Sequence, residues 1–281
     1  MCTFMYTSAN KERKVNHGEG YNKLSNQPLT LVVAEFRFAP LNLDCEELWS
    51  FREQLDARMN GRAMQNTVQN ARFEAEGLRI TASPLLRWHA EAAGESVQLE
   101  ADRLIFSTTQ YPRFPDFSNK VKKLLASLEE TMPLHGLRRI GLRYNDAIVP
   151  EAEEDLADYL QAAFLPWPSF GEKPLPVARH TTETIFSTPS GTLAIRALLG
   201  CHGQSFMPDV RDRFGLQSPI EVPDDRATAV LDFDHYWQDT TQENTEFSVD
   251  KAIKRLGMLH EPAREAFWNV TTDFARNEKW R

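Results

Sequence analysis

Arg139-Ile-Gly-Leu-Arg-Tyr-Asn145 lies at the middle of the 281-residue chain, and its pattern indicates how the whole chain is organised. Apolar and polar residues alternate along it, as they do in a strand with one buried face. Glu35-Phe-Arg-Phe38 shows the same alternation much earlier in the chain. An acidic stretch where a helix can begin follows each segment, at residues 44–47 and 151–155. The central segment therefore marks the point at which an order of elements begins again.

The elements around these two strands follow one order, which is strand, helix, three strands, helix. Spacing and turn signals place the first set at residues 31–38, 45–59, 86–92, 97–101, 104–109 and 117–132. They place the second set at residues 139–148, 153–164, 178–187, 192–199, 227–237 and 246–278. Pro262 should kink or restart the last helix, and residues 200–225 are irregular.

This order predicts an α+β protein made of two similar β-α-β-β-β-α halves, at residues 29–136 and 137–281. Each half has too few helices to cover both faces of its sheet, so we expect one extended antiparallel sheet with helices on one face. Residues 1–28 are polar and without periodicity, which predicts a flexible tail or an arm that becomes ordered on a partner.

Composition narrows the class of protein. The net charge of -8 argues against broad, sequence-independent binding of nucleic acid, which needs clustered Lys and Arg. Cys2, Cys45 and Cys201 are too far apart for a disulfide framework or a zinc site, and free thiols suit a reducing cytosol. The sequence has neither a long apolar run nor the apolar core of a signal peptide, so we expect a cytoplasmic protein that does not bind membranes.

Charged and polar residues gather on the face of the sheet that is expected to be uncovered. They are Glu35, Arg37, Arg139, Arg143, Asn145, Glu183, Arg196, Asp232 and Asp234. One interpretation is a set of cross-strand ion pairs that keep a one-sided sheet in water. The other is a concave groove that binds a peptide, a protein helix or a small anionic ligand. In that groove Arg37, Arg143 and Arg196 would bind the anion.

Leu231-Asp-Phe-Asp-His-Tyr-Trp237 is the most suggestive segment for chemistry. Strand alternation puts Asp232 and Asp234 on one face with their β-carbons roughly 7 Å apart, and paired carboxylates can hold a divalent ion. His235 falls on the opposite face, so a metal site would need ligands from elsewhere. Ion pairs with neighbouring arginines are the alternative, and Tyr236 is a candidate contact for a small ligand in the groove.

Other catalytic patterns are weak or missing from the sequence. Gly200-Cys-His-Gly203 places a thiol beside an imidazole, but adjacent residues rarely face one another. No GxSxG, GxxxxGK[ST] or GxGxxG pattern occurs, so neither a nucleophile elbow nor a nucleotide cofactor is expected, and no metal is assigned. We expect His180 and His260 to be hydrogen-bonded structural residues.

Several motifs together resemble a sporadically distributed family of uncharacterised prokaryotic proteins. They are Gln27-Pro-Leu29 with Glu35–Phe38, Arg139–Asn145, Leu231–Tyr236, Leu259-His260, Phe267, Thr271-Thr272 and Trp280. The resemblance covers residues 26–281 and implies no chemistry. The patchy distribution of the family is similar to that of genes on mobile elements, including defence and toxin–antitoxin loci.

These observations lead to three functional hypotheses. The first is a non-enzymatic binding or adaptor protein, such as a subunit or antitoxin-like regulator in a prokaryotic defence system, which binds a protein partner or a second copy of itself. The second is a metal-dependent hydrolase or nuclease that uses Asp232 and Asp234. The third is a small-ligand sensor that uses the groove and Tyr236.

Overall fold

The computed structural model describes residues 24–43, 46–59, 61–74, 77–167, 175, 177–200, 202–240 and 247–281. Its strands are β1 (Leu29–Arg37), β2 (Arg62–Glu74), β3 (Gly77–Ala90), β4 (Glu95–Glu100), β5 (Arg103–Thr108), β6 (Arg139–Ile148), β7 (His180–Thr188), β8 (Gly191–Leu199) and β9 (Ala229–Gln238). Its α-helices are α1 (Glu46–Met59), α2 (Phe114–Thr131), α3 (Leu156–Tyr159) and α4 (Val249–Val270). The mixture of helices and strands confirms the α+β class.

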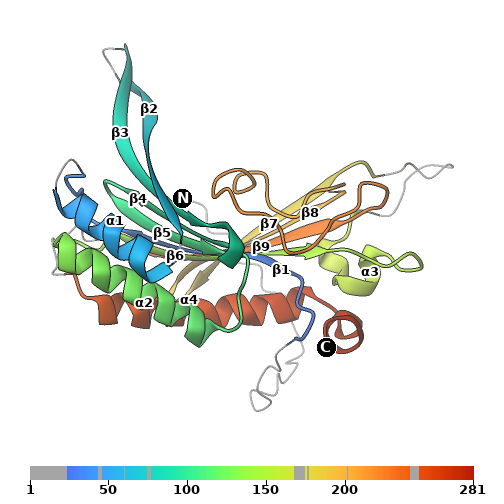
Figure 1. The fold of residues 1–281 in the computed structure, drawn as a ribbon. Helices are drawn as coiled ribbons and strands as arrows, with labels where there is room; N and C mark the ends of the chain where they lie inside the picture. Colours follow the sequence, from blue (N-terminus) through green and yellow to red (C-terminus); the bar gives the residue numbers. More distant parts are fainter. Residues whose placement is uncertain are drawn as a thin grey trace.

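The described strands form one nine-stranded sheet in the order β2-β3-β4-β5-β1-β6-β9-β8-β7 (Figure 1). Every neighbouring pair is antiparallel. β1 and β6 lie side by side at the centre, where Val33 is paired with Arg143. Outward from β1 come β5, β4, β3 and β2, and outward from β6 come β9, β8 and β7. The extended antiparallel sheet is therefore as the sequence predicts.

Residues 29–136 contain one strand more than expected, because β2 was not predicted. Leu85–Ala90 of β3 pairs with β4, but Gly77–Pro84 pairs only with β2. The outer parts of β2 and β3 thus form a two-stranded arm that projects from the sheet (Figure 1). Apolar alternation arises where one face of a strand is buried against a core, and an arm outside the sheet is not subject to that requirement. The expected hairpin at Gly94 is present between β3 and β4.

The helix expected at 153–164 is wrong, and so is one of the two alternatives given for the last helix, a restart at Pro262. The helix expected at 153–164 is only the four residues of α3 and a 3-10 turn at Ala162–Phe164, because Leu160 leaves the helix to form a bridge with Thr271. The last helix does not restart at Pro262, since α4 runs through it and ends before Thr271. The buried stripe of α4, which includes Leu256, Leu259 and Ala263, offsets the cost of a proline inside a helix.

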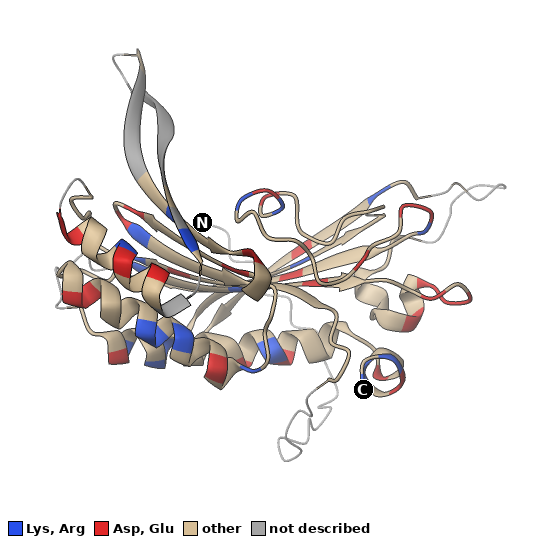
Figure 2. Cartoon of the chain, viewed as in Figure 1, with Lys and Arg blue, Asp and Glu red and all other residues tan. Residues whose placement is uncertain are grey.

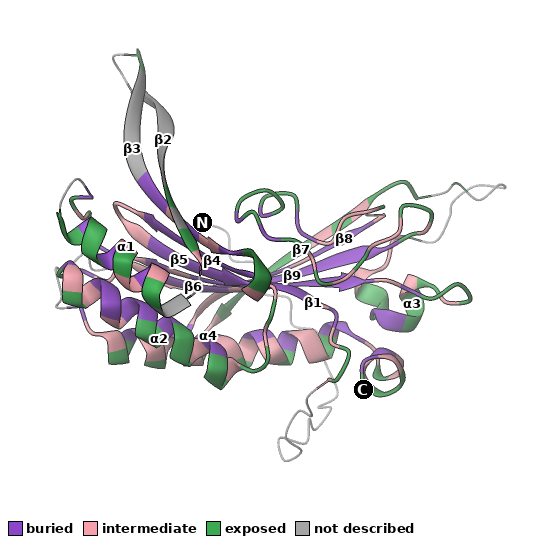
Figure 3. Cartoon of the chain, viewed as in Figure 1, coloured by how far each residue is buried: buried purple, intermediate pink, exposed green. Residues whose placement is uncertain are grey.

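The main core lies between the sheet and the helices α1, α2 and α4, which share one face of the sheet (Figure 1). Figure 3 shows that the central strands are buried, whereas the connecting loops are mostly exposed. No described helix combines the length and the apolar character that crossing a membrane requires. Part of the predicted tail is ordered, since Asn26 N–H donates to Trp280 O (3.1 Å) and Ala147 N–H donates to Pro28 O (2.8 Å). Residues 1–23 lie outside the described part.

The sequence predicted that the face of the sheet opposite the helices would be uncovered, and this prediction is wrong. Residues 202–228, between β8 and β9, contain neither helix nor strand, and we call them the insertion. Phe206, Met207 and Phe214 of the insertion are buried in a second apolar cluster with Leu31 and Val33 of β1. The insertion therefore covers the middle of this face, where the sequence predicted an open groove.

Candidate functional site

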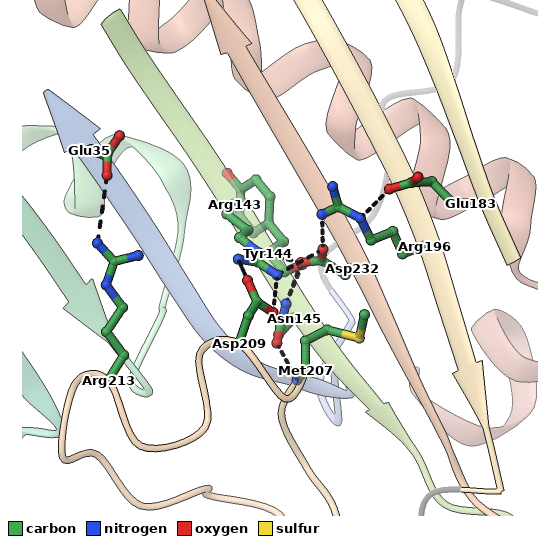
Figure 4. A network of polar contacts seen from close by, with 10 residues as sticks. All are labelled: Glu35, Arg143, Tyr144, Asn145, Glu183, Arg196, Met207, Asp209, Arg213 and Asp232. Atoms are coloured by element: carbon green, nitrogen blue, oxygen red, sulfur yellow. Dashed lines mark hydrogen bonds and ion pairs between the residues drawn. The ribbon is translucent and has the colours of Figure 1, made fainter. Parts of the chain in front are cut away.

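Asp232 is the centre of a polar network on the insertion side of the sheet (Figure 4). The register places Asn145 of β6 on one side of Asp232 and Arg196 of β8 on the other. The carboxylate is 0% exposed and accepts four hydrogen bonds. Arg143 donates from Nε (2.6 Å) and Nη2 (3.1 Å), Asn145 from Nδ2 (2.6 Å) and Arg196 from Nη1 (2.9 Å). Both oxygens of Asp232 are therefore engaged.

The insertion is attached to the sheet through this network. Asp209 receives hydrogen bonds from Arg143 Nη1 (2.6 Å) and Nη2 (2.9 Å), and Asn145 Oδ1 accepts the Met207 N–H (3.0 Å). Desolvation opposes the charge of Arg143, yet its bonds to Asp209 and Asp232 raise the pKa of the guanidinium. At the outer side, Arg196 Nε donates to Glu183 (2.6 Å). Arg143 and Arg196 are thus engaged with carboxylates of the chain itself.

Three more of the predicted residues, Glu35, Arg37 and Arg139, form a neighbouring cluster. Arg37 Nε and Arg139 Nη1 donate to Glu35 Oε1 at 2.7 and 3.0 Å. The Arg139 guanidinium also lies 4.3 Å from the centre of the Tyr236 ring, a cation–π contact. Figure 2 shows that acidic and basic residues occur along the strands as well as on the helices. The geometry on this face matches the cross-strand ion pairs that the sequence allowed.

Asp234 does not join Asp232 around a shared site. It stands opposite Arg143 in the register but has no hydrogen bond to any described residue. Burial raises the pKa of Asp234, and the neighbouring arginines counter this only in part. His235, on the other face, bonds to Thr188 Oγ1 (2.9 Å) and Leu259 O (2.7 Å). Within the described ranges, no three His, Cys, Asp or Glu residues gather in a way that could hold a metal ion.

A pocket of about 350 Å³ lies on the helix side of the same strands. Its lining includes Tyr144 and Asp146 of β6 and His260 of α4. Tyr111, just before α2, and Phe114, the first residue of α2, also line it. Tyr144 Oη and His260 Nδ1 are 2.8 Å apart, and the Phe114 ring stacks on the imidazole at 4.2 Å. Burial lowers the pKa of His260 to about 4, so the ring is neutral at pH 7. His260 is therefore hydrogen-bonded, as predicted.

Asp146 is the residue of this pocket that sequence reasoning missed. The residue is 3% exposed, and no described residue donates a hydrogen bond to its side chain. Burial, with a smaller contribution from Asp232, raises the pKa of Asp146 to about 8. The signal was present, because alternation along β6 places Asp146 on the same side as Leu142 and Tyr144. A carboxylate at a strand position that points to the buried face is a candidate for function.

Other sequence candidates do not form a site. His202 of Gly200-Cys-His-Gly203 bonds to Asp224 O (3.1 Å), and Cys201 lies outside the described residues. His180, predicted to be hydrogen-bonded, has a buried Nε2 without a described partner. Comparison with models of protein families finds no match for the chain. A search of curated proteins finds none either.

Proposed function

We propose that the chain is a non-enzymatic binding protein that accepts an extended segment of a partner protein along the outer edge of β7. One observation carries this proposal. β7 pairs with β8 through all nine of its residues, and no described strand pairs with its other edge. The unpaired N–H and C=O groups of such an edge are a template for an added strand.

The two ends of the sheet support the proposal when they are compared as products of an internal duplication, which we also propose. In that correspondence β1, β5, β4 and β3 match β6, β9, β8 and β7. The outer edge of β3 is covered by β2, whereas no strand among the described residues covers the matching edge of β7. The sequence that precedes β7 contains Pro166, Pro168, Pro174 and Pro176, which have no N–H for a strand ladder. The partner segment would take the place that β2 takes in the first half.

The composition of β7 also favours strand addition. Ile185 and Phe186 are 62% and 47% exposed and, as neighbours in a strand, point to opposite faces. Glu183 is the only Asp, Glu, Lys or Arg in the sequence at 180–188, and Arg196 already pairs with it. Natural edge strands are commonly protected by lysine, proline or a bulge, and His180–Thr188 contains no lysine and no proline.

A partner segment fits this edge better than a second copy of the chain. Pairing two copies through β7 would double the number of strands in one sheet, and twisted open sheets rarely exceed about ten strands. A single added strand stays within that range. The defence-locus association of the family that the sequence resembles makes a toxin or another defence subunit the first partner to test.

The test combines substitution with cross-linking. The double variant Ile185→Lys with Phe186→Lys places charges on the edge, and Met258→Lys on α4 is the matched control because Met258 is also 47% exposed. A photo-cross-linking residue at Ser187 identifies what lies against the strand in native cells. We expect one protein that co-purifies with the wild type and the control, cross-links from position 187, and is lost in the double variant.

Two outcomes would contradict the proposal. One is a partner that binds the double variant as well as the wild type, which places the contact elsewhere. The other is a cross-link from position 187 to a second copy of the chain, with a dimer in sedimentation analysis, which makes self-association the role of the edge.

A further inference from the structure

We propose that the pocket on the helix side of β6 binds an organic ammonium group, with the Asp146 carboxylate as its counter-ion and the surrounding aromatic rings as its walls. This site is separate from the β7 edge and goes beyond the function proposed above. The ammonium group can belong to a free amine or to the lysine side chain of a protein, since both present the same chemistry.

The carboxylate is the first reason. Buried carboxylates normally have hydrogen-bond donors or a cation close by, because a bare buried charge is costly. Asp146 is 3% exposed, lines the pocket and has neither kind of partner among the described residues. A ligand that brings positive charge and N–H donors supplies what the site lacks.

The walls are the second reason. Tyr111, Phe114, Tyr144, Phe233, Phe267 and Trp268 all line the pocket. The faces of aromatic rings attract cations, and aromatic cages are a known means of binding ammonium groups. Tyr144 lies two positions from Asp146 on the same strand, so an ammonium beside the carboxylate is also close to a ring. The cavity volume of about 350 Å³ is in the range of small-molecule sites.

The other charged and titratable groups of the pocket leave room for a cation. Facing it are Tyr111 and Arg113 from the link before α2, Tyr144 from β6, and His260 and Arg264 from α4. His260 is neutral at pH 7, Arg264 forms an ion pair with Glu261, and Arg113 is exposed to solvent. The raised pKa of Asp146 comes from burial and from Asp232, which lies on the other face of the sheet. Neither Arg113 nor Arg264 contributes to it.

The geometry also links binding to a proton. Because burial raises the pKa of Asp146 to about 8, its carboxyl group is mostly protonated below that pH in the absence of a ligand, and an ammonium ligand binds to the deprotonated form. The apparent affinity falls with the fraction of protein in the competent form, so it should drop on the order of fifty-fold between pH 8 and pH 6. A neutral ligand would show no such dependence.

The experiment uses amines paired with neutral alcohols of the same shape, for example 2-phenylethylamine with 2-phenylethanol. Thermal unfolding of the full chain at pH 8 should show a rise in Tm of about 3 °C at ten times the Kd of a binding amine. Calorimetry of that amine at pH 8 and pH 6 then gives the change in affinity and the proton release. A peptide with one internal lysine, tested beside the free amines, shows which source of ammonium the pocket accepts.

Asp146→Asn keeps the shape of the side chain and removes the charge, so binding of the amine should be lost. Asp234→Asn is the matched control, because Asp234 is a partly buried carboxylate with a raised pKa on the opposite face, and this variant should bind like the wild type. If no amine or lysine peptide stabilises the wild type more than the Asp146→Asn variant, the proposal is overturned. Equal binding of amine and alcohol, independent of pH, would overturn it as well. Neither result bears on the β7 edge.

Discussion

Asp232 and Asp146 are both buried carboxylates in adjacent strands, but they lie on opposite faces of the sheet and in opposite electrostatic situations. Asp232 accepts four hydrogen bonds, three of them from the guanidinium groups of Arg143 and Arg196. Asp146 accepts none from any described residue, and the pKa of its carboxyl is raised to about 8. Two carboxylates can therefore be equally buried and still differ in the hydrogen-bond donors around them, and donors to the charged form favour that form.

The comparison separates a structural role from a functional one. On the insertion side the charges neutralise one another and attach residues 202–228 to the sheet. On the helix side the carboxyl group of Asp146 lines a pocket, and no described residue donates a hydrogen bond to it. Mutations at these two aspartates should therefore change stability in opposite directions.

Asp232→Ala should have the largest effect. Removing the carboxylate leaves the partly buried guanidinium groups of Arg143 and Arg196 without their shared counter-ion, which should lower the free energy of unfolding by about 3–5 kcal/mol. Denaturant titration at pH 7 measures this loss. Asp102→Ala, which removes a more exposed partner of Arg103, is the control and should cost less than about 1 kcal/mol. Similar losses in the two variants would show that the network around Asp232 is not important for stability.

Asp146→Asn should instead stabilise the ligand-free protein, by up to about 4 kcal/mol at pH 7, because one pKa unit corresponds to about 1.4 kcal/mol. The folded pKa of Asp146 is raised above the ordinary value of 3.8, so between about pH 4 and pH 8 the folded state binds a proton that the unfolded state has released. In this window the wild type loses stability as pH rises, and the variant lacks that loss. The two proteins should unfold alike at pH 4. Chemical denaturation from pH 4 to pH 8 measures the difference, and equal slopes for both proteins would rule out a raised pKa.

Most of the correct predictions from the sequence come from the alternation of apolar and polar residues along the strands. A period of two residues places Arg143 and Asn145 on one face of β6, and Asp232 on the same face of β9, without knowledge of the strand order. The proximity of Arg196 to Asp232 follows from the pairing of β8 with β9. The amphipathic helices α2 and α4 were visible for a similar reason, because one stripe of each packs on the sheet.

Two of the features that sequence reasoning missed, the insertion and β2, have no period to follow. The insertion has no regular structure, so nothing in its sequence indicated that Asp209 would meet Arg143 or that Phe206 and Phe214 would cover the sheet. β2 pairs over much of its length with a strand that extends beyond the sheet, where burial does not impose alternation. Asp146 lay in a clear pattern, but a single carboxylate among apolar positions was interpreted as part of a strand and not as a possible site.

The smallest expected effect tests whether the insertion depends on the network. Asp209→Ala removes the insertion carboxylate to which Arg143 of the sheet donates its hydrogen bonds. Because the Asp209 side chain is largely exposed, the loss of stability should be about 1 kcal/mol. The local effect should be larger, since the insertion loses one of its attachments to the sheet. Hydrogen exchange of residues 202–217 should therefore become faster while exchange in β6 and β9 is unchanged. Asp212→Ala changes an exposed carboxylate of the same insertion that has no described partner, and it should leave exchange as in the wild type. Faster exchange in both variants would mean that the insertion responds to its net charge and not to its bond with Arg143.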